Sequence, residues 1–189
     1  MEFGKKKCDG LVVRIAGNDR SALAELYESY KNPVYGLALA ILKNRPDAED
    51  VMQNVFVQGW DKAGQYRPGT DPGAWILKIA RNLSMDKLRR RKDMTDIMEL
   101  EDVLQDGGEV SSSPDRMLLR ELLMELDCVE RQIVVLHAVG GYSHREIAGI
   151  VGRPYATVRW KYGNAMKKLK RSLEKEYFYE QQAQFAANR

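Results

Sequence analysis

The residues whose types and spacing point to chemistry lie between residues 143 and 173, where basic side chains follow a glycine turn. Seven lysines and arginines and no acid occur between residues 153 and 171. Such a cluster can bond phosphates and guanine edges, so it predicts a nucleic-acid surface. Seven acids and no base lie between residues 96 and 115. The small net charge of +3 therefore conceals two separate electrostatic surfaces.

Two short helices joined by a glycine turn would position these cations. Ser143 and Glu146 have the spacing of a capping box, so a helix is expected to begin there. Gly152 should end that helix, and Pro154 should open a second one, since proline suits a first helical turn. The buried stripe of the second helix is expected to contain Val158, Ala165, Met166 and Leu169. The pattern predicts a DNA-binding helix-turn-helix, whereas a basic helix that only coats the surface needs neither the capping box nor the turn.

Residues near the start of the second helix can reach base edges in a major groove. Arg159 is suited to a bidentate bond with guanine, which is worth about 1–3 kcal/mol of discrimination. The lysines farther along the helix are better placed for phosphates, which give affinity without sequence choice. The candidate DNA-binding residues of this helix are Tyr155, Thr157, Arg159, Trp160, Lys161, Asn164, Lys167 and Lys168.

The rest of the chain also favours helices. Periodic apolar residues predict a helix over residues 21–42, which Pro33 should bend or split. A second helix should begin at Asp47 in a run of acids, and a third should cover residues 74–91 after a Gly- and Pro-rich loop over residues 63–73. The alternation typical of half-buried strands is rare. The expected fold class is all-α, with two small helical domains joined by an acidic flexible linker.

Composition changes along the chain suggest the domain boundaries. Residues 1–20 are expected to be an N-terminal extension, residues 21–93 a first domain and residues 94–114 the linker. Residues 115–175 should form the second domain. Residues 176–189 form a tail with three open alternatives: it extends the last helix, binds a regulator or, by default, frays.

In the second domain, helices are expected over residues 115–126 and 130–139, ahead of the helix-turn-helix. His137, on an apolar face, should pack in the core, whereas His144 should be exposed. No cysteine or acid stands at ligand spacing from either histidine, so no metal, cofactor or catalytic site is expected. An enzyme is therefore the least favoured class, and no small-molecule substrate is indicated.

The hydropathy of the chain gives no sign of a membrane segment. No apolar run approaches the ~20 residues that span a bilayer, and no signal-peptide core follows the N-terminal charges. We expect a cytoplasmic protein without membrane insertion.

Three blocks together resemble a known family. DAEDVMQNVFVQGWDK (residues 47–62), AWILKIARNLSMDKLRRRK (residues 74–92) and the segment from Leu126 to Leu173 occur in the order typical of extracytoplasmic-function sigma factors of the sigma-70 family. The resemblance implies two helical domains, σ2 and σ4, in a factor that binds core RNA polymerase and directs it to promoter DNA. It also implies an anti-sigma factor as a partner.

The same resemblance implies roles for individual residues. The implied contacts with core polymerase are Asp50, Gln53, Asn54 and Gln58. The implied −10 element contacts, in a loop and the helix after it, are Tyr66, Arg67, Trp75, Lys78, Arg81, Asn82, Lys87 and Arg89. Aromatic surfaces and cations suit unpaired bases and their backbone, although Trp75 is also a candidate core residue that fixes the loop. The helix-turn-helix would read the −35 element.

Several positions depart from the family pattern, which is close to P-x-G-T-V-K-S-R-L-x-R-A in the recognition helix, where this chain has PYATVRWKYGNA. Trp160 replaces a small serine, Asn164 replaces an arginine, and Gly163 costs about 1 kcal/mol relative to alanine inside a helix. The DNA preference of the family therefore does not transfer. Asn54 replaces an acidic residue, and Pro68 departs from an arginine-glycine pattern in the loop.

One alternative explains the C-terminal half equally well: a helix-turn-helix transcriptional regulator with an unrelated N-terminal domain. The block over residues 47–62 and the basic helix over residues 74–92 count against it. Such a regulator would bind duplex DNA alone, whereas a sigma factor acts with core polymerase.

Overall fold

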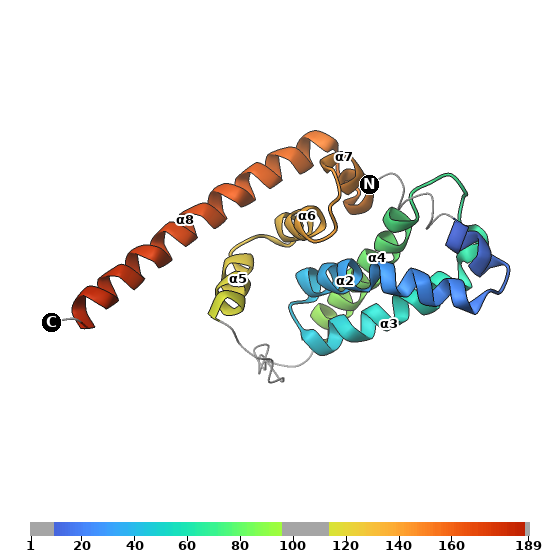
Figure 1. Cartoon of the computed structure of the whole chain (residues 1–189), viewed down its shortest axis with the longest axis horizontal. Helices are drawn as coiled ribbons and strands as arrows, with labels where there is room; N and C mark the ends of the chain where they lie inside the picture. Colours follow the sequence, from blue (N-terminus) through green and yellow to red (C-terminus); the bar gives the residue numbers. More distant parts are fainter. Residues whose placement is uncertain (1–9, 96–113, 188–189) are drawn as a thin grey trace.

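The computed structural model describes residues 10–95 and 114–187. Helical residues 10–16 precede α2 (Arg20–Leu42), α3 (Arg45–Asp61), η1 (Ala63–Gln65), α4 (Pro72–Thr95), α5 (Pro114–Met124), α6 (Cys128–Ala138), α7 (His144–Val151) and α8 (Tyr155–Ala187). The described ranges contain no strand, which confirms the predicted all-α class (Figure 1). Most of the predicted linker, residues 94–114, lies outside them.

The helices α2, α3 and α4 pack against one another and form the first unit. The Asn44 side chain accepts a hydrogen bond from the backbone N–H of Asp47, so Asn44 caps α3. The helix consequently begins at Arg45, two residues before the predicted start, because the proline that follows fits a first helical turn.

The helix α2 runs without interruption through Pro33. Of the two predicted effects of this proline, a bend or a split, the split is therefore wrong. An internal proline costs about 3 kcal/mol through a lost hydrogen bond and a steric clash. Leu26, Val34 and Leu37 of the same helix are fully buried, and each such side chain contributes about 1.5–3 kcal/mol. Packing on both sides of the proline therefore outweighs its cost.

Residues 10–16 form a helix that the sequence did not predict. Leu11, Val12 and Ile15 are buried against Leu26 of α2 and Tyr66 of the following loop. Part of the expected N-terminal extension thus completes the core of the first unit, beside the loop that precedes α4.

The second unit comprises α5 to α8. Asp127 caps α6 and forms a capping box with Glu130, so α6 begins two residues before the predicted residue 130. The helix α8 continues to Ala187 and projects beyond the other helices in Figure 1, so the prediction of a fraying tail is wrong up to that residue. No glycine or proline interrupts the chain after Gly163, which allows one long helix.

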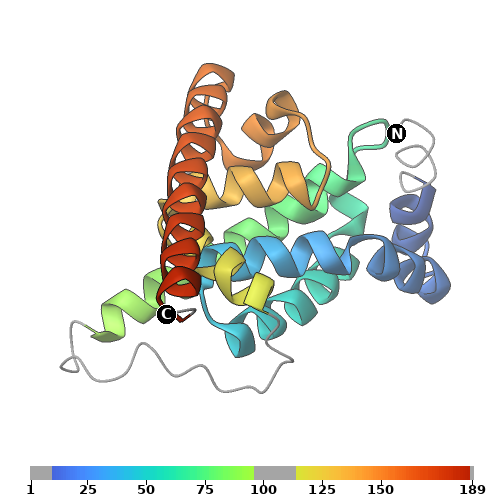
Figure 2. The same ribbon diagram turned by 60° about the vertical axis from the view of Figure 1, so that its left-hand side comes forward.

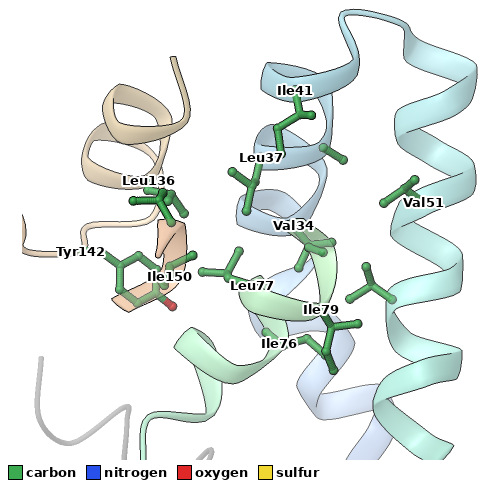
Figure 3. Close-up of a cluster of buried hydrophobic side chains, with 14 of the residues drawn as sticks. Val34, Leu37, Ile41, Val51, Ile76, Leu77, Ile79, Leu136, Tyr142 and Ile150 are labelled. Carbon is green, nitrogen blue, oxygen red and sulfur yellow. The ribbon is translucent and has the colours of Figure 1, made fainter. Parts of the chain in front are cut away.

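The two units share one hydrophobic core, because α6 packs on α2 and α7 packs on α4 (Figure 2). Leu77 of α4 and Leu37 of α2 face Leu136, Tyr142 and Ile150 of the second unit (Figure 3). These side chains are at most 7% exposed.

Glycine permits close approach at this junction. A Cβ atom on Gly36 would lie 3.3 Å from Cγ1 of Val135, and one on Gly73 would overlap the hydroxyl of Tyr142. A larger side chain at Gly73 would displace Tyr142 and Tyr30, whereas a Cβ atom at Gly36 requires Val135 to shift by only a few tenths of an ångström.

Within the helices that the structure describes, none combines the length and the apolar character that a bilayer span requires.

Candidate nucleic-acid interface

The helix-turn-helix has the local geometry that the sequence predicts. The Ser143 hydroxyl accepts from the backbone N–H of Glu146, and the Glu146 carboxylate accepts from the backbone N–H of Ser143 at 2.9 Å. Gly152 has a φ of 64° and ends α7 in the left-handed region, where other residues are strained. The backbone N–H of Val158 donates to the carbonyl of Pro154 at 3.1 Å, at the first turn of α8. The capping box, the glycine turn and the restart at Pro154 are therefore confirmed.

The buried face of α8 differs from the prediction at one residue. Val158 and Ala165 are fully buried, and Leu169 is partly buried, as expected. Met166 is 43% exposed, so its assignment to the buried stripe is wrong. Tyr162 packs against the core in its place, because its spacing from Val158 and Ala165 continues one helical face.

The opposite face of α8 carries most of the candidate base-reading residues. Tyr155 and Trp160 are 46% and 63% exposed, and Arg159 and Lys167 are also exposed. Asn164, like Thr157, is half-buried. Two large aromatic side chains on a cationic surface are unusual for a merely solvated face and favour contact with a partner.

Two of the lysines predicted to bind DNA form ion pairs with acids at the start of α6. The ammonium group of Lys161 lies 2.6 Å from a carboxylate oxygen of Asp127, and that of Lys168 lies 2.7 Å from the buried carboxylate of Glu130. Burial acts to raise the pKa of Asp127, but hydrogen bonds from Lys161 and from backbone N–H groups outweigh it and lower the pKa overall. The hydrogen bond to Glu130 raises the pKa of Lys168.

The two histidines meet at the start of α7. The rings of His137 and His144 lie 5.0 Å apart, and each contacts the ring of Tyr162. His144 is half-buried, so the prediction of an exposed side chain is wrong. Burial, followed by the neighbouring His137 and Arg159, lowers the pKa of His144. In the described ranges there is no group of three side chains that could hold a metal ion. His137 of α6 and His144 of α7 both pack on Tyr162 of α8.

The candidate −10 residues of α4 do not all lie on one face of the helix. Lys78, Asn82 and Arg89 are exposed and share one helical face through their spacing. Arg81 donates from Nε to the Gln132 side-chain oxygen at 3.1 Å, so it faces the second unit.

Lys87 of α4 points toward α3. Its ammonium group lies 2.9 Å from Asp47 and 2.6 Å from Asp50. Burial acts to lower the pKa of Lys87, but the bonds to Asp50 and Asp47 outweigh it and raise the pKa. A predicted DNA contact and a predicted polymerase contact, Asp50, are thus joined in one ion pair.

The loop before α4 is held by its aromatic residues. Tyr66 is 7% exposed, donates its hydroxyl to the carbonyl of Thr70 at 2.8 Å, and meets the Trp75 ring edge-on with centroids 5.4 Å apart. Asp71 caps α4 by accepting from the backbone N–H groups of the following glycine and alanine. Arg67 is exposed at the loop surface. Tyr66 and Trp75 therefore set the shape of the loop that presents Arg67.

The candidate polymerase-binding residues lie mainly on the outer face of α3. Asp50, Gln53 and Asn54 are exposed, and the Asn54 amide donates to the carbonyl of Asp50 at 2.9 Å. Gln58 is half-buried and bonded to a neighbouring lysine. The sequence analysis missed Val57, which is 59% exposed and follows the same stripe at helical spacing. Its position outside the apolar stripe of α3 is the signal that could have identified it.

Comparisons with known proteins match both units. The family model described as "Sigma-70 region 2" matches residues 26–94, and the model described as "Sigma-70, region 4" matches residues 116–169. The extracytoplasmic-function (ECF) RNA polymerase sigma factor SigK of Mycobacterium bovis is 25% identical over 176 residues, which cover 88% of this chain and 93% of SigK. The RNA polymerase sigma factor CarQ of Myxococcus xanthus is 28% identical over 163 residues, which cover 85% of this chain and 94% of CarQ.

Two solved structures share the fold. CnrH, solved in complex with the cytosolic domain of CnrY, has a TM-score of 0.68 at 23% identity and covers 88% of this chain and 96% of its own. The sigma factor RpoE of Bartonella quintana, solved in complex with the anti-sigma factor NepR, has a TM-score of 0.71 at 20% identity and covers 80% of this chain and 96% of its own.

Proposed function

Because the chain belongs to the extracytoplasmic-function group of the sigma-70 family, whose members are non-catalytic initiation factors that direct transcription from specific promoters, we propose how its two units divide that work. Residues 21–93 bind core polymerase and the −10 element, and residues 115–175 read the −35 element. The observation that carries this division is the order of the two sigma-70 regions, the second of which ends in a capped helix-turn-helix with a cationic outer face. The match of region 2 disfavours a regulator with an unrelated N-terminal domain.

The −35 element is read by the outer face of α8. Arg159 and Lys167 supply charge there, and Tyr155 and Trp160 supply apolar surface. Lys161 and Lys168 contribute indirectly, because their ion pairs with α6 fix the angle at which α8 leaves the helix-turn-helix.

The −10 element is contacted by the exposed stripe of Lys78, Asn82 and Arg89 and by Arg67 of the loop. Their exposure and their chemistry support this proposal. The cations suit the DNA backbone, and the amide suits base edges. Tyr66 is buried, so in this proposal it shapes the loop together with its aromatic neighbour unless the loop opens on DNA.

The outer face of α3 docks on core polymerase. Four of its exposed residues combine one charge, two amides and the apolar side chain of Val57, a mixture typical of protein interfaces. The Asp50–Lys87 ion pair lies at the border between this face and α4.

We also propose an anti-sigma partner. RpoE, which shares the fold, was solved with the anti-sigma factor NepR, and CnrH was solved with the cytosolic domain of CnrY. The partner would compete either for the α3 face or for the junction of the two units.

Co-elution with bacterial core polymerase tests the proposed docking face. Val57→Glu should weaken co-elution without a change in helicity, since a charge replaces the exposed apolar side chain. Val13→Glu is a matched control, because Val13 is also exposed, at 48%, but lies on the N-terminal helix. Equal binding by both variants would remove α3 from the interface. A wild-type chain that binds duplex DNA but never core polymerase would favour the regulator instead.

A further inference from the structure

The outer face of α8 is hollowed where the helix-turn-helix meets its DNA. An open hollow of about 450 Å³ lies along the first turns of the helix. Ala156 and Gly163 are among its lining residues, and they lie seven residues apart, two turns along the same face. These are the two smallest side chains of the outer face, so they form the floor. By helical spacing, Tyr155 and Arg159 flank this floor on one side, and Trp160 and Asn164 flank it on the other.

Gly163 has no explanation within the protein. It lies inside α8, and its φ is not in the left-handed range that requires glycine. A Cβ atom placed on it would meet no atom within 4 Å. Alanine would therefore fit and would favour the helix. Because Gly163 also lines the hollow, its missing side chain leaves room there for a group from outside the chain.

The walls of the hollow indicate which group fits. Trp160 presents an indole that is 63% exposed, and such an apolar surface suits the 5-methyl group of thymine. The Asn164 carboxamide can accept from N6 and donate to N7 of adenine, a pairing that distinguishes adenine in the major groove. The two residues are four apart and share one wall, so they would meet neighbouring edges of the same site.

The indole of Trp160 also lies near a cation, Lys161. The ammonium group of Lys161 lies 5.9 Å from the centre of the Trp160 ring and is itself bonded to Asp127 of α6. These contacts connect Trp160 through Lys161 to the residue that caps α6.

We propose that this hollow seats an A·T base pair in the −35 region, with Asn164 on the adenine, the indole of Trp160 on the thymine methyl, and Gly163 providing the clearance. The inference rests on the proposed function, because it needs α8 to enter a promoter major groove. It makes Gly163 a specificity-determining residue through the absence of a side chain.

The first test compares two glycine variants in the full-length chain with core polymerase. A duplex pool randomised over the −35 region is transcribed by the holoenzyme, and the enriched sequences are read. The wild-type holoenzyme should enrich an A·T pair at one position, and Gly163→Ala should lose about five- to 150-fold of that preference. The melting temperature of Gly163→Ala should equal or exceed that of the wild type.

The matched control is Gly149→Ala. Gly149 lies within α7 and also has open space around its Cβ, but it does not line the hollow. This variant should keep the wild-type preference. If Gly163→Ala keeps it as well, the hollow does not seat a base pair.

The second test removes single groups from the DNA. In the selected promoter, uracil in place of the thymine removes the methyl group, and 7-deazaadenine removes the N7 acceptor. The first change should weaken wild-type initiation several-fold but leave Trp160→Ala unaffected, and the second should do the same for Asn164→Ala. Equal losses in wild type and variants would overturn the inference, as would binding that depends on charge alone.

Different results would contradict the base-pair site in the hollow and the proposed function. A holoenzyme that initiates from the pool without any A·T preference contradicts the hollow and leaves the proposed function standing. A chain that supports no initiation from any pool contradicts both.

Discussion

The guanidinium of Arg131 donates a hydrogen bond of 2.9 Å to the backbone carbonyl of Ala40, a residue 91 positions away in the other unit. The same side chain donates to the carbonyls of Leu123 and Leu126 at 2.8 and 2.7 Å. Arg131 is 4% exposed, and burial lowers its pKa. One buried cation therefore joins α2 to α6 and also closes the turn between α5 and α6.

Arg131→Met should reduce the free energy of unfolding by about 2–4 kcal/mol, because three carbonyl acceptors would lose a buried donor. Denaturant titration followed by circular dichroism measures the loss. Arg153→Met is the control, since Arg153 is exposed in the turn between α7 and α8 and should change stability little. A loss for Arg131→Met no larger than that of the control would show that the shared core alone joins the units.

The proposed function predicts that the two units separate on a complete promoter. The −10 and −35 elements lie roughly 25 base pairs, or about 85 Å, apart at 3.4 Å per base pair. In the structure α7 packs on both α4 and α8, and each helix–helix distance is only about 10 Å. The surfaces proposed for the two elements are thus separated by far less than the DNA demands, and the units must part when both are bound.

A disulfide between Gly36→Cys and Val135→Cys tests this separation, because these residues face each other at the junction. The two native cysteines are first replaced by serine. The oxidised form should then fail to bind both promoter elements together and fail to initiate transcription, and reduction should restore initiation. Each single cysteine variant serves as a control for the effect of the substitution itself. Equal initiation by the oxidised and reduced forms would mean that the closed arrangement is the active one.

Salt dependence distinguishes base readers from phosphate contacts on α8. Arg159→Ala should weaken one promoter position by about 1–3 kcal/mol and leave others unchanged. Lys170→Ala should weaken all sequences alike and reduce the slope of log affinity against log salt by about one, since Lys170 is 78% exposed along the same helix. Lys168 is unsuited to this test because its bond to Glu130 is structural. Identical behaviour of the two variants would show that α8 is placed wrongly on DNA.

The histidine pair predicts a loss of stability in mild acid. The pKa of His144 lies below its usual 6.5, since burial and the nearby His137 and Arg159 disfavour its charged form. The unfolded chain therefore binds the proton more readily, so this contribution is complete above about pH 6.5 and declines as the pH falls through that value. Tyr162, the other group in contact with the ring, is neutral over this window.

Thermal unfolding between pH 8 and pH 5 measures the effect. His144→Gln should flatten the decline of melting temperature below pH 6.5, because glutamine has no proton to gain. Parallel curves for the variant and the wild type would show that other groups govern the acid sensitivity.

Local signals in the sequence were sufficient for the helix-turn-helix. Ser143 and Glu146 form a capping box from their spacing alone, and Gly152 takes the left-handed conformation that ends a helix. These features depend on neighbours within four residues, so a single sequence contains them. Met166 and Tyr162 were harder, because both fit an apolar stripe and only the direction of α6 decides which one is buried.

Contacts between distant segments could not be predicted. The Asp127–Lys161 and Glu130–Lys168 ion pairs turn two predicted DNA contacts toward α6, and no local pattern indicates this. The burial of Arg131 likewise depends on the packing of α6 on α2. The candidate residues of α3 and α4 came from the family resemblance, but which of them face the solvent and which face the other unit required the fold.

In-vitro transcription with bacterial core polymerase, with start sites mapped across genomic DNA, tests whether this chain is a promoter-specificity factor. We expect the full-length chain to make core polymerase initiate at a defined set of sites that share −10 and −35 elements, and core polymerase alone not to do so. Duplex binding by the chain without polymerase, together with no new start site in its presence, would contradict it.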